Sequence, residues 1–514
     1  MEYAIAVIDI GMTNKKVAVY DDSLHQVSAE YRDFAPRMVD GLPTHDLEAM
    51  EGWFLEQLTQ LAQRYPIRAI AVTTHGATFT CVGADGKPSV PCVYYTYEPG
   101  DGFHDRFYEK FGAPEDLQRV TGTPYFKAMI NPAKGIFFIK EKYPAAFAKT
   151  RWVLNYPQYW SFRLTGKVGA EGTYVGCHSY LWDWEKKRWS SVADGLGISA
   201  LMPKTLNNSW DVLGTITEEV AQKTGLGRDV IVTMGIHDSN SSLLPHFAKK
   251  GDRGFVLNST GTWCVIMNPV KEYKFAPEEL GKVVFFNQSA FRTPVKTAIF
   301  LGGQEFETWS KVLMDLHGRT DLPPYDEALY RRILGEKSAF ILPELTAGSG
   351  QFPLSKPRVV EQNRDYPFAE IEKAVSSGKT AEGPGSPIPP CFRNYERGIA
   401  ILRISLVLQT LTALERAGLQ PGVEVFTEGG FRKNEAYNAL LSAALPDNPT
   451  ALTDIAEATA FGAAMTAKMA LTGKALADLA QDFTIDYLEV PKRDIPELIP
   501  YRSLWTALAE KQKE

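Results

Sequence analysis

The same short plan occurs once in each half of the chain: an apolar stretch, a turn of small polar residues and a second apolar stretch. Residues 4–20 read AIAVIDIGMTNKKVAVY, and residues 255–267 read FVLNSTGTWCVIM. Runs of valine and isoleucine on both sides of a short turn predict two paired β-strands. Because the unit occurs twice, we expect two related domains that face one cleft and are joined near residues 247–252. The length of 514 residues also exceeds what one hydrophobic core usually supports.

The first of these turns has the residue types that bind phosphate. Gly11 lets a ligand approach the backbone closely, successive amide groups form a concave anion site, and Lys16 adds positive charge. Asp9 would repel a bare phosphate, so a Mg²⁺ ion between the two would explain its presence. The second turn, with Gly261 and Thr262, offers hydroxyl and amide groups in the same way. For both turns the alternative is a purely structural hairpin turn.

An aspartate stands where an apolar strand is expected to end, in the stretch RDVIVTMGIHDSNSS (residues 228–242). A carboxylate at this position, Asp238, would be able to accept the proton of a substrate hydroxyl as the hydroxyl oxygen attacks a γ-phosphate. The alternative is that Asp238 is the N-cap of the helix that follows. We interpret the neighbouring His237 as a packed or hydrogen-bonding histidine, because no second metal ligand stands at metal-binding spacing.

A pair of glycines precedes a predicted helix in the stretch VEVFTEGGFRKNEAYNALLSAAL (residues 423–445). Gly429 and Gly430, together with Asn434, would let a flat adenine and its ribose lie against the backbone. The alternative is an ordinary turn from a strand to a helix.

Polar residues also end the strand-like stretch IRAIAVTTHG (residues 67–76). Thr74, His75 and Gly76 are candidate sugar contacts, because ligands of α/β proteins bind at the carboxyl ends of strands. Weaker candidates, for which a solvated or structural role is favoured, are Tyr95, Glu98 and Glu171.

Composition limits the kinds of partner and environment. The formal net charge is −6 and the basic residues form no stripe, so nucleic acid is not expected as a partner. The longest apolar stretches are strand-length or interrupted by charge, and the N-terminus lacks the pattern of an export signal, so neither a membrane span nor export is expected. The five cysteines include no CxxC pair, which favours a reducing cytoplasm and a buried apolar role for each.

Other stretches predict the framework around these motifs. Helical spacing of apolar residues predicts a helix over 46–64 and a long amphipathic helix over 395–418. Asp85 and Gly86 predict the turn of a hairpin, and the small residues of EATAFGAAMTAKMA predict a closely packed helix. Residues 378–390 are rich in glycine and proline and predict an exposed loop.

Six motifs follow one another in a specific order: Asp-x-Gly-x-Thr, a polar strand end, Gly-x-His-Asp, Ser-Thr-Gly-Thr-Trp, Gly-Gly-x-x-x-Asn and Glu-Ala-Thr-Ala-x-Gly-Ala-Ala. This order resembles the FGGY carbohydrate kinases, and the match covers nearly the whole chain. The resemblance implies an α/β fold of the actin, Hsp70 and sugar-kinase type, which is ribonuclease H-like, with an ATP cleft between two domains. The implied domains are residues 1–248, with the sugar site and first phosphate turn, and residues 249–514, with the second phosphate turn and adenosine site.

The resemblance also implies roles for individual residues. Asp238 matches the catalytic base, and Asp9 with Asp238 would hold Mg²⁺. The position of Lys16 is often arginine in the family, and lysine holds phosphate with a different geometry from arginine. The implied ATP contacts are Asp9, Gly11, Thr13, Asn14, Lys16, Gly261, Thr262, Gly429, Gly430 and Asn434, and the sugar contacts are Thr74, His75, Gly76, His237 and Asp238.

Within the family, IRAIAVTTHG, GIHDS and STGTW are most similar to the L-fuculose and L-rhamnulose kinases. Two regions depart from the family pattern, because VYYTYEPG lacks an Asp-x-Arg and AEGTYVGCHS lacks an acidic-x-x-Asn, and both normally shape the sugar pocket. We therefore predict a cytoplasmic kinase that uses ATP and Mg²⁺ on a terminal hydroxyl of a ketose, with a pentulose (xylulose or ribulose) as the alternative substrate. Alternatives from other classes are a non-catalytic nucleotide-binding sugar sensor and a chaperone-like or filament ATPase. A homodimer is a candidate assembly.

Overall fold

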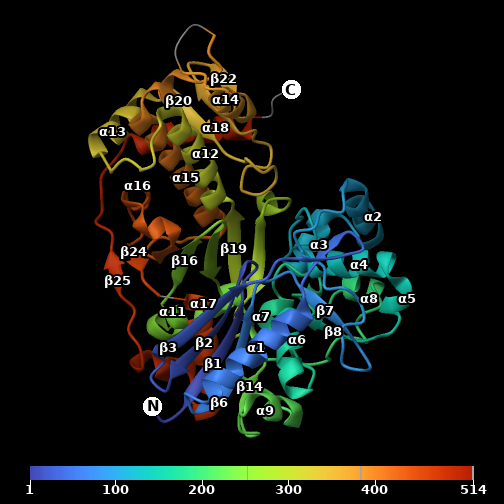
Figure 1. Ribbon diagram of the computed structural model, residues 1–514. Coiled ribbons are helices and arrows are strands. Elements are labelled where there is room, and N and C mark those ends of the chain that lie inside the picture. Colours follow the sequence, from blue (N-terminus) through green and yellow to red (C-terminus); the bar gives the residue numbers. More distant parts are fainter. Residues whose placement is uncertain (252, 382–384, 456, 512–514) are drawn as a thin grey trace.

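Two mixed seven-stranded sheets form the framework of the protein (Figure 1). The computed structural model describes residues 1–251, 253–381, 385–455 and 457–511. The first sheet runs β13 (Val212–Thr215), β14 (Ile231–Thr233), β6 (Ile67–Thr74), β1 (Ala4–Ile10), β2 (Asn14–Asp21) and β3 (Gln26–Asp33), and β15 (Ile236–His237) also pairs with β6. The second runs β18 (Val284–Gln288), β19 (Pro294–Phe300), β17 (Cys264–Pro269), β16 (Phe255–Thr260), β23 (Glu424–Gly429), β24 (Thr450–Thr453) and β25 (Tyr487–Glu489).

The two sheets share one local topology, which confirms the repeat predicted from the sequence. Strand β1 pairs antiparallel with β2 and parallel with β6. In the same way, β16 pairs antiparallel with β17 and parallel with β23. Each central strand is buried along most of its length, which explains why it reads as a continuous apolar run and not as an alternating one.

Both faces of the first sheet are covered by helices. Alternate residues of β1 face in opposite directions. Ile8 and its neighbours on one face pack with α1 (Leu47–Ala62) and α6 (Tyr156–Thr165). Ile5 and Val7 on the other face pack with α17 (Ala458–Thr472). Figure 1 shows this late helix, in red-orange, beside the blue first strands. The segment after residue 248 therefore contributes a helix to the first sheet.

The second sheet packs on a long buried helix, α15 (Tyr395–Arg416). Its residues from Gly398 to Leu414 are all buried, so the expectation of an amphipathic helix was wrong. By length and composition α15 could cross a membrane, with a mean hydropathy of 1.5, but 94% of the apolar stretch is buried inside the protein. A core helix between layers of a large domain has this character.

One smaller expectation is confirmed and another is corrected. At Asp85 and Gly86 the chain turns back as predicted, with an antiparallel bridge between Val82 and Pro88 and a hydrogen bond from the Gly83 amide to the Lys87 carbonyl at 2.8 Å. The ladder partner of β7 (Phe79–Gly83) is β8 (Thr150–Asn155). In the loop 378–390, Ala381 and Ile388 are buried, while residues 382–384 lie outside the described part of the chain. All five cysteines are buried and free, as expected.

The other elements complete the two halves. Those of the first half are β4 (Arg37–Val39), β5 (Leu42–Thr44), α2 (Asp101–Phe111), α3 (Pro114–Thr121), α4 (Pro132–Lys142), α5 (Pro144–Phe147), β9 (Ala170–Glu171), α7 (Gly172–Val175), β10 (Trp182–Asp183), β11 (Arg188–Trp189), α8 (Ser191–Gly195), β12 (Leu206–Asn207), α9 (Glu218–Thr224), α10 (Asp238–Ser241) and α11 (Leu244–Lys250). Those of the second half are η1 (Pro277–Glu279), α12 (Gly302–His317), α13 (Glu327–Glu336), β20 (Ala339–Leu342), β21 (Arg358–Glu361), β22 (Arg364–Pro367), α14 (Phe368–Ser376), η2 (Pro390–Arg393), η3 (Gly430–Lys433), α16 (Glu435–Ala444), η4 (Leu476–Gln481) and α18 (Leu498–Glu510).

Candidate active site

The carboxyl ends of three parallel strands bring Asp9 and Asp238 to the same edge of the first sheet. Strand β6 lies between β1 and β15, and Thr73 is paired with Asp9 on one side and with Ile236 on the other. Asp238 follows β15 directly. The two aspartates therefore flank the end of β6, where ligands of α/β proteins bind.

Asp238 is the first residue of α10, and its side chain is 27% exposed. The N-cap position belongs to His237, so the alternative that Asp238 caps this helix is wrong. Its carboxylate accepts hydrogen bonds from the Ser239 amide at 2.5 Å and the Ser239 hydroxyl at 3.2 Å. Burial, reinforced by the negative charge of Asp9, raises the pKa of Asp238 to about 7. Asp238 is therefore a carboxyl group suited to proton transfer near neutral pH.

The first phosphate-type turn is held in place by hydrogen bonds from a buried lysine. Lys15 is fully buried, and its ammonium group donates to the carbonyls of Met12 at 2.8 Å and Thr13 at 3.1 Å. The turn leaves Thr13 and Asn14 exposed, where a ligand can reach them. Sequence reasoning did not single out Lys15, because a lysine within a strand gives no sign that it faces inward.

Asp9 and Lys16 belong to a network that includes the start of α17. The Lys16 ammonium lies 3.0 Å from an Asp9 carboxylate oxygen and also donates to Glu457. The Thr459 hydroxyl donates to Asp9 at 2.7 Å, and the Tyr31 hydroxyl donates to Glu457 at 2.9 Å. In this structure Lys16 is therefore engaged with two carboxylates, and its predicted contact with phosphate stays a prediction. The motif Glu-Ala-Thr-Ala marked Glu457 and Thr459, but not their role.

The second turn lies against the first residues of α12. Gly261 and Thr262 are exposed, and the Gln304 amide donates to the Thr262 carbonyl at 3.3 Å. A Cβ atom on Gly303 would lie 1.9 Å from the Gly261 carbonyl oxygen, so only glycine allows this approach. Gly303 was not predicted from the sequence, although its Gly-Gly context at a helix start is a signal.

The two glycines before α16 differ. Gly429 has a φ of +80°, and a Cβ atom there would lie 2.0 Å from the Thr260 carbonyl oxygen. This supports the structural alternative for Gly429, a turn that packs against the end of β16. Asn434 caps α16 by accepting from the Tyr437 amide at 3.2 Å. Gly430 and Asn434 line a cavity of 460 Å³ whose other walls include Phe306, Pro324, Tyr325 and Arg403.

A second cavity of 460 Å³ contains Asp238 and is lined by both halves of the chain. It brings together the predicted residues His75, Gly76, His237 and Asp238. Thr74 is not part of the wall, because it is fully buried and its hydroxyl donates to the His75 carbonyl at 2.9 Å. This cavity, called the substrate pocket below, is also lined by Tyr95, Phe126, Lys127, Ile130, Cys177, His178, Trp263, Phe285, Asn287, Leu301 and residues 346–349.

Two family models match this chain, and together they cover most of it. The model of the FGGY family of carbohydrate kinases, N-terminal domain, matches residues 4–245, and that of the carbohydrate kinase FGGY, C-terminal domain, matches residues 252–475. The chain belongs to the FGGY family of carbohydrate kinases. The predicted fold class, a two-domain α/β fold of the actin and Hsp70 type, is confirmed.

Individual relatives differ in the sugar that their names specify. A rhamnulokinase of Halalkalibacterium halodurans is 25% identical over 273 residues, which is 52% of this chain and 56% of the relative. A xylulose kinase of Bacillus subtilis is 31% identical over 183 residues, which is 35% of each chain. The chain thus matches about half or less of the length of these curated relatives. The crystal structure of a carbohydrate kinase from Novosphingobium aromaticivorans aligns over 99% of both chains, with a TM-score of 0.79 and 26% identity.

In this FGGY protein His237 is a packed, hydrogen-bonded histidine, as interpreted from the sequence, but potential metal ligands do lie beside it. Its Nε2 atom lies 3.2 Å from Asp238 and 3.6 Å from the Cys177 sulfur, and His178 also lies nearby. The sequence argument found no second metal ligand, because these neighbours are about 60 residues away along the chain. Burial lowers the pKa of both His178 and His237 to about 3. Both imidazoles are therefore neutral at physiological pH.

Residues 126–128 line the FGGY substrate pocket and are held in place by hydrogen bonds. Glu98 accepts from the Ala128 amide at 2.6 Å, and Lys134 donates to the Phe126 carbonyl at 2.6 Å. Glu98 therefore has a structural role, as favoured from the sequence. Glu171 also lies away from the pocket and caps α7, whereas Tyr95 does line the pocket.

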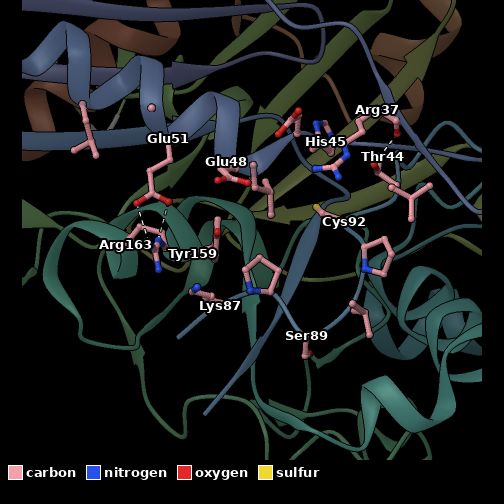
Figure 2. Close-up of a pocket in the computed structure, with 18 of the residues that line it drawn as sticks. Arg37, Thr44, His45, Glu48, Glu51, Lys87, Ser89, Cys92, Tyr159 and Arg163 are labelled. Carbon is pink, nitrogen blue, oxygen red and sulfur yellow. Dashed lines mark hydrogen bonds and ion pairs between the residues drawn. The ribbon is translucent and has the colours of Figure 1, made fainter. Parts of the chain in front are cut away.

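A larger cavity of 690 Å³ lies beside the start of α1 (Figure 2). It contains none of the predicted site residues, and its wall includes the ion pair of Arg163 with Glu51 at 2.8 Å. His45, at the edge of this cavity, stacks on His75 with ring centres 5.7 Å apart. The two cavities are therefore separated by a pair of stacked imidazoles.

Proposed function

We propose that this protein transfers the γ-phosphate of ATP to a terminal hydroxyl of a ketose, with Asp238 as the general base. The observation that carries the proposal is the position of Asp238 in a pocket lined by both halves of an FGGY chain. The same carboxylate lies at the sheet edge that holds the first phosphate-type turn. Sugar and phosphate would therefore meet at Asp238.

Asp238 would accept the proton of the attacking hydroxyl. A base is most effective when its pKa lies near the working pH, and the pKa of Asp238 is raised to about 7. Asp238 lines the pocket and its side chain is partly exposed, so a sugar hydroxyl would be able to reach it. Closure of the two halves around both ligands would exclude water and limit hydrolysis of ATP.

The exposed turns are the proposed contacts of the triphosphate. Thr13 and Asn14 in the first turn and Gly261 and Thr262 in the second offer amide and hydroxyl donors. The cavity beside Gly430 and Asn434 is the proposed adenosine site. There the Asn434 side-chain nitrogen is buried and has no hydrogen-bond partner among the described residues, so it is free to bind a ligand.

The residues present fit a Mg²⁺ ion between the two aspartates. Asp9 and Asp238 flank β6, and the charge of Asp9 helps to raise the pKa of Asp238, which shows that the two groups repel each other when both are ionised. Oxygen ligands of this kind are those that Mg²⁺ prefers. When bound, the ion would offset the negative charge that develops on the phosphoryl group.

We propose a 6-deoxyketose, L-fuculose or L-rhamnulose, as the first substrate to test and a pentulose as the second. The motif similarity supports the deoxyketose, and the apolar side chains of Phe126, Ile130 and Phe285 in the pocket wall offer a surface for a methyl group. The xylulose kinase relative supports the pentulose. The pocket also holds polar groups for sugar hydroxyls, such as His75 and Asn287.

An ADP-release assay across a panel of ketoses and polyols tests the proposal. Stimulation by one sugar supports a kinase, sugar-independent release indicates an ATPase, and no release indicates a sensor. Asp238→Asn keeps the shape of the side chain but removes the base, and we expect it to lower kcat by about 10² to 10⁴. Full sugar-dependent turnover in this variant would remove Asp238 as the base. Glu98→Gln, behind the pocket, is the control for general damage to the site.

A further inference from the structure

Three potential metal ligands converge in the wall of the substrate pocket. The ligand atoms of Cys177, His178 and His237 all lie within 4.8 Å of one another. The Cys177 sulfur is 3.6 Å from the His237 Nε2 atom. Around a tetrahedral Zn²⁺ ion, with bonds of about 2.0 to 2.3 Å, ligand atoms lie about 3.5 Å apart. The cluster therefore needs only small side-chain movements to reach metal-binding geometry.

Both imidazole rings are oriented by a partner on the nitrogen that faces away from the cluster. His178 donates from Nδ1 to the Ile130 carbonyl at 3.1 Å, which leaves the Nε2 lone pair free. The side-chain nitrogen of Asn240 lies 3.1 Å from Nδ1 of His237. The Asn240 side-chain oxygen has no hydrogen-bond partner among the described residues, so turning this amide over lets the oxygen accept from Nδ1–H and leaves the lone pair on Nε2. Histidines that bind metals usually have such a second partner, which fixes the ring and the reactive nitrogen.

Both Nε2 atoms lie close to a glycine. A Cβ atom on Gly76 would lie 2.9 Å from Nε2 of His237 and 3.0 Å from Nε2 of His178. The two nitrogens therefore lie beside the same point of the backbone, where a side chain would collide with both. Gly76, Cys177, His178 and His237 all line the substrate pocket, which gives an ion a path of entry. His178 also has a positive φ of 34°, a strained conformation that is typical of binding sites.

We propose that Cys177, His178 and His237 bind a soft divalent metal ion such as Zn²⁺, with the fourth coordination position open to the pocket. One thiolate and two imidazoles suit Zn²⁺ or Co²⁺ and not Mg²⁺, which prefers oxygen ligands. As the sulfur–metal bond forms, the thiol proton leaves to solvent, so one proton is released for each ion bound. This site differs from the proposed Mg²⁺ position between Asp9 and Asp238, and its existence does not depend on kinase activity.

Titration of the full-length, chelator-treated protein with Co²⁺ tests the site. We expect one Co²⁺ per chain, a thiolate-to-Co²⁺ charge-transfer band in the near ultraviolet and visible bands of tetrahedral intensity. Added Zn²⁺ should displace the Co²⁺ and remove these bands. The charge-transfer band should be absent in Cys177→Ser and present in Cys391→Ser, a matched change of a buried cysteine in the second half.

A second variant covers the case in which Cys177→Ser does not fold. His178→Gln keeps the cysteine but removes one ligand, and competition with a chromophoric chelator should show at least about a tenfold loss of Zn²⁺ affinity. Circular dichroism checks that each variant is folded. Absence of the band in the unaltered protein, or its persistence in folded Cys177→Ser, would overturn the proposal. A protein that binds Co²⁺ here but phosphorylates no sugar would contradict only the proposed function.

Discussion

At the scale of single residues, neighbouring glycines in one motif have different physical roles. Gly429 has a left-handed backbone, and its hydrogen atom occupies a position where a Cβ would collide with the Thr260 carbonyl. Gly430 has no such constraint, because the nearest atom to an added Cβ is 3.7 Å away. The Gly-Gly pair is thus one structural glycine followed by one that borders the proposed adenosine cavity.

This difference predicts unequal effects of the same substitution. Gly429→Ala should lower the free energy of unfolding by at least about 1 to 3 kcal/mol, because it combines backbone strain with a steric clash. Gly430→Ala, the matched control, should change it by less than about 0.5 kcal/mol. Urea unfolding followed by circular dichroism measures both values. Equal losses of stability in the two variants would contradict the assignment.

At the scale of elements, helix α12 links the second phosphate-type turn to the substrate pocket. It begins against Gly261, and its buried Glu305 accepts from the Glu344 amide at 2.7 Å and the Gln409 side chain at 3.0 Å. Glu344 has a positive φ of 76° and accepts from the amides of Ser349 and Phe352, both at 3.0 Å. The two carboxyl groups therefore hold the loop whose residues 346–349 line the pocket.

Glu305 also predicts how stability depends on pH. Burial raises its pKa from an ordinary 4.5 to about 7, so between these values the folded state binds more protons than the unfolded state. The contribution of this group to stability is therefore complete below about pH 4.5 and is lost as pH rises to about 7. Glu305→Gln cannot ionise at this position. As pH rises, its free energy of unfolding should therefore fall by at least about 1 kcal/mol less than that of the unaltered protein. Urea titrations at pH 5 and pH 8 compare the two proteins, and identical slopes against pH would contradict the prediction.

At the scale of the whole molecule, the two halves of the sequence are not structurally independent, because the second half contributes a helix to the first sheet. Helix α17, from the second half, covers the face of the first sheet that carries Ile5, Val7 and Ala71. At Gly462 this helix lies so close to α10 that a Cβ atom on the glycine would be 2.0 Å from the Ser241 carbonyl oxygen. Through Thr459 and Glu457 the start of the same helix contacts Asp9 and Lys16. The proposed phosphate site therefore depends on both ends of the chain.

We expect a fragment of residues 1–248 not to fold on its own. Without α17, an apolar face of the first sheet would be exposed to water, which favours aggregation over a stable monomer. Circular dichroism and thermal unfolding of the fragment, compared with the full chain, measure this. A soluble fragment with a cooperative unfolding transition would show that the first half is an independent folding unit.

The sequence by itself determined the strand–turn–strand repeat, the helices at 46–64 and 395–418 and the order of the family motifs. These features are local, because apolar spacing and turn residues act on neighbouring positions. The local patterns also placed Asp9 and Asp238 at strand ends, and the structure brings those ends together.

Only the tertiary structure decided which distant residues meet. Nothing in the stretch around His237 indicates that Cys177 and His178 lie beside it, or that Glu457 and Thr459 contact Lys16 and Asp9. It also decided that Thr74 faces inward and that α15 is buried on nearly every side. The reason is that such contacts depend on how sheets and helices pack across the whole chain, and the local pattern of a single segment does not encode its distant neighbours.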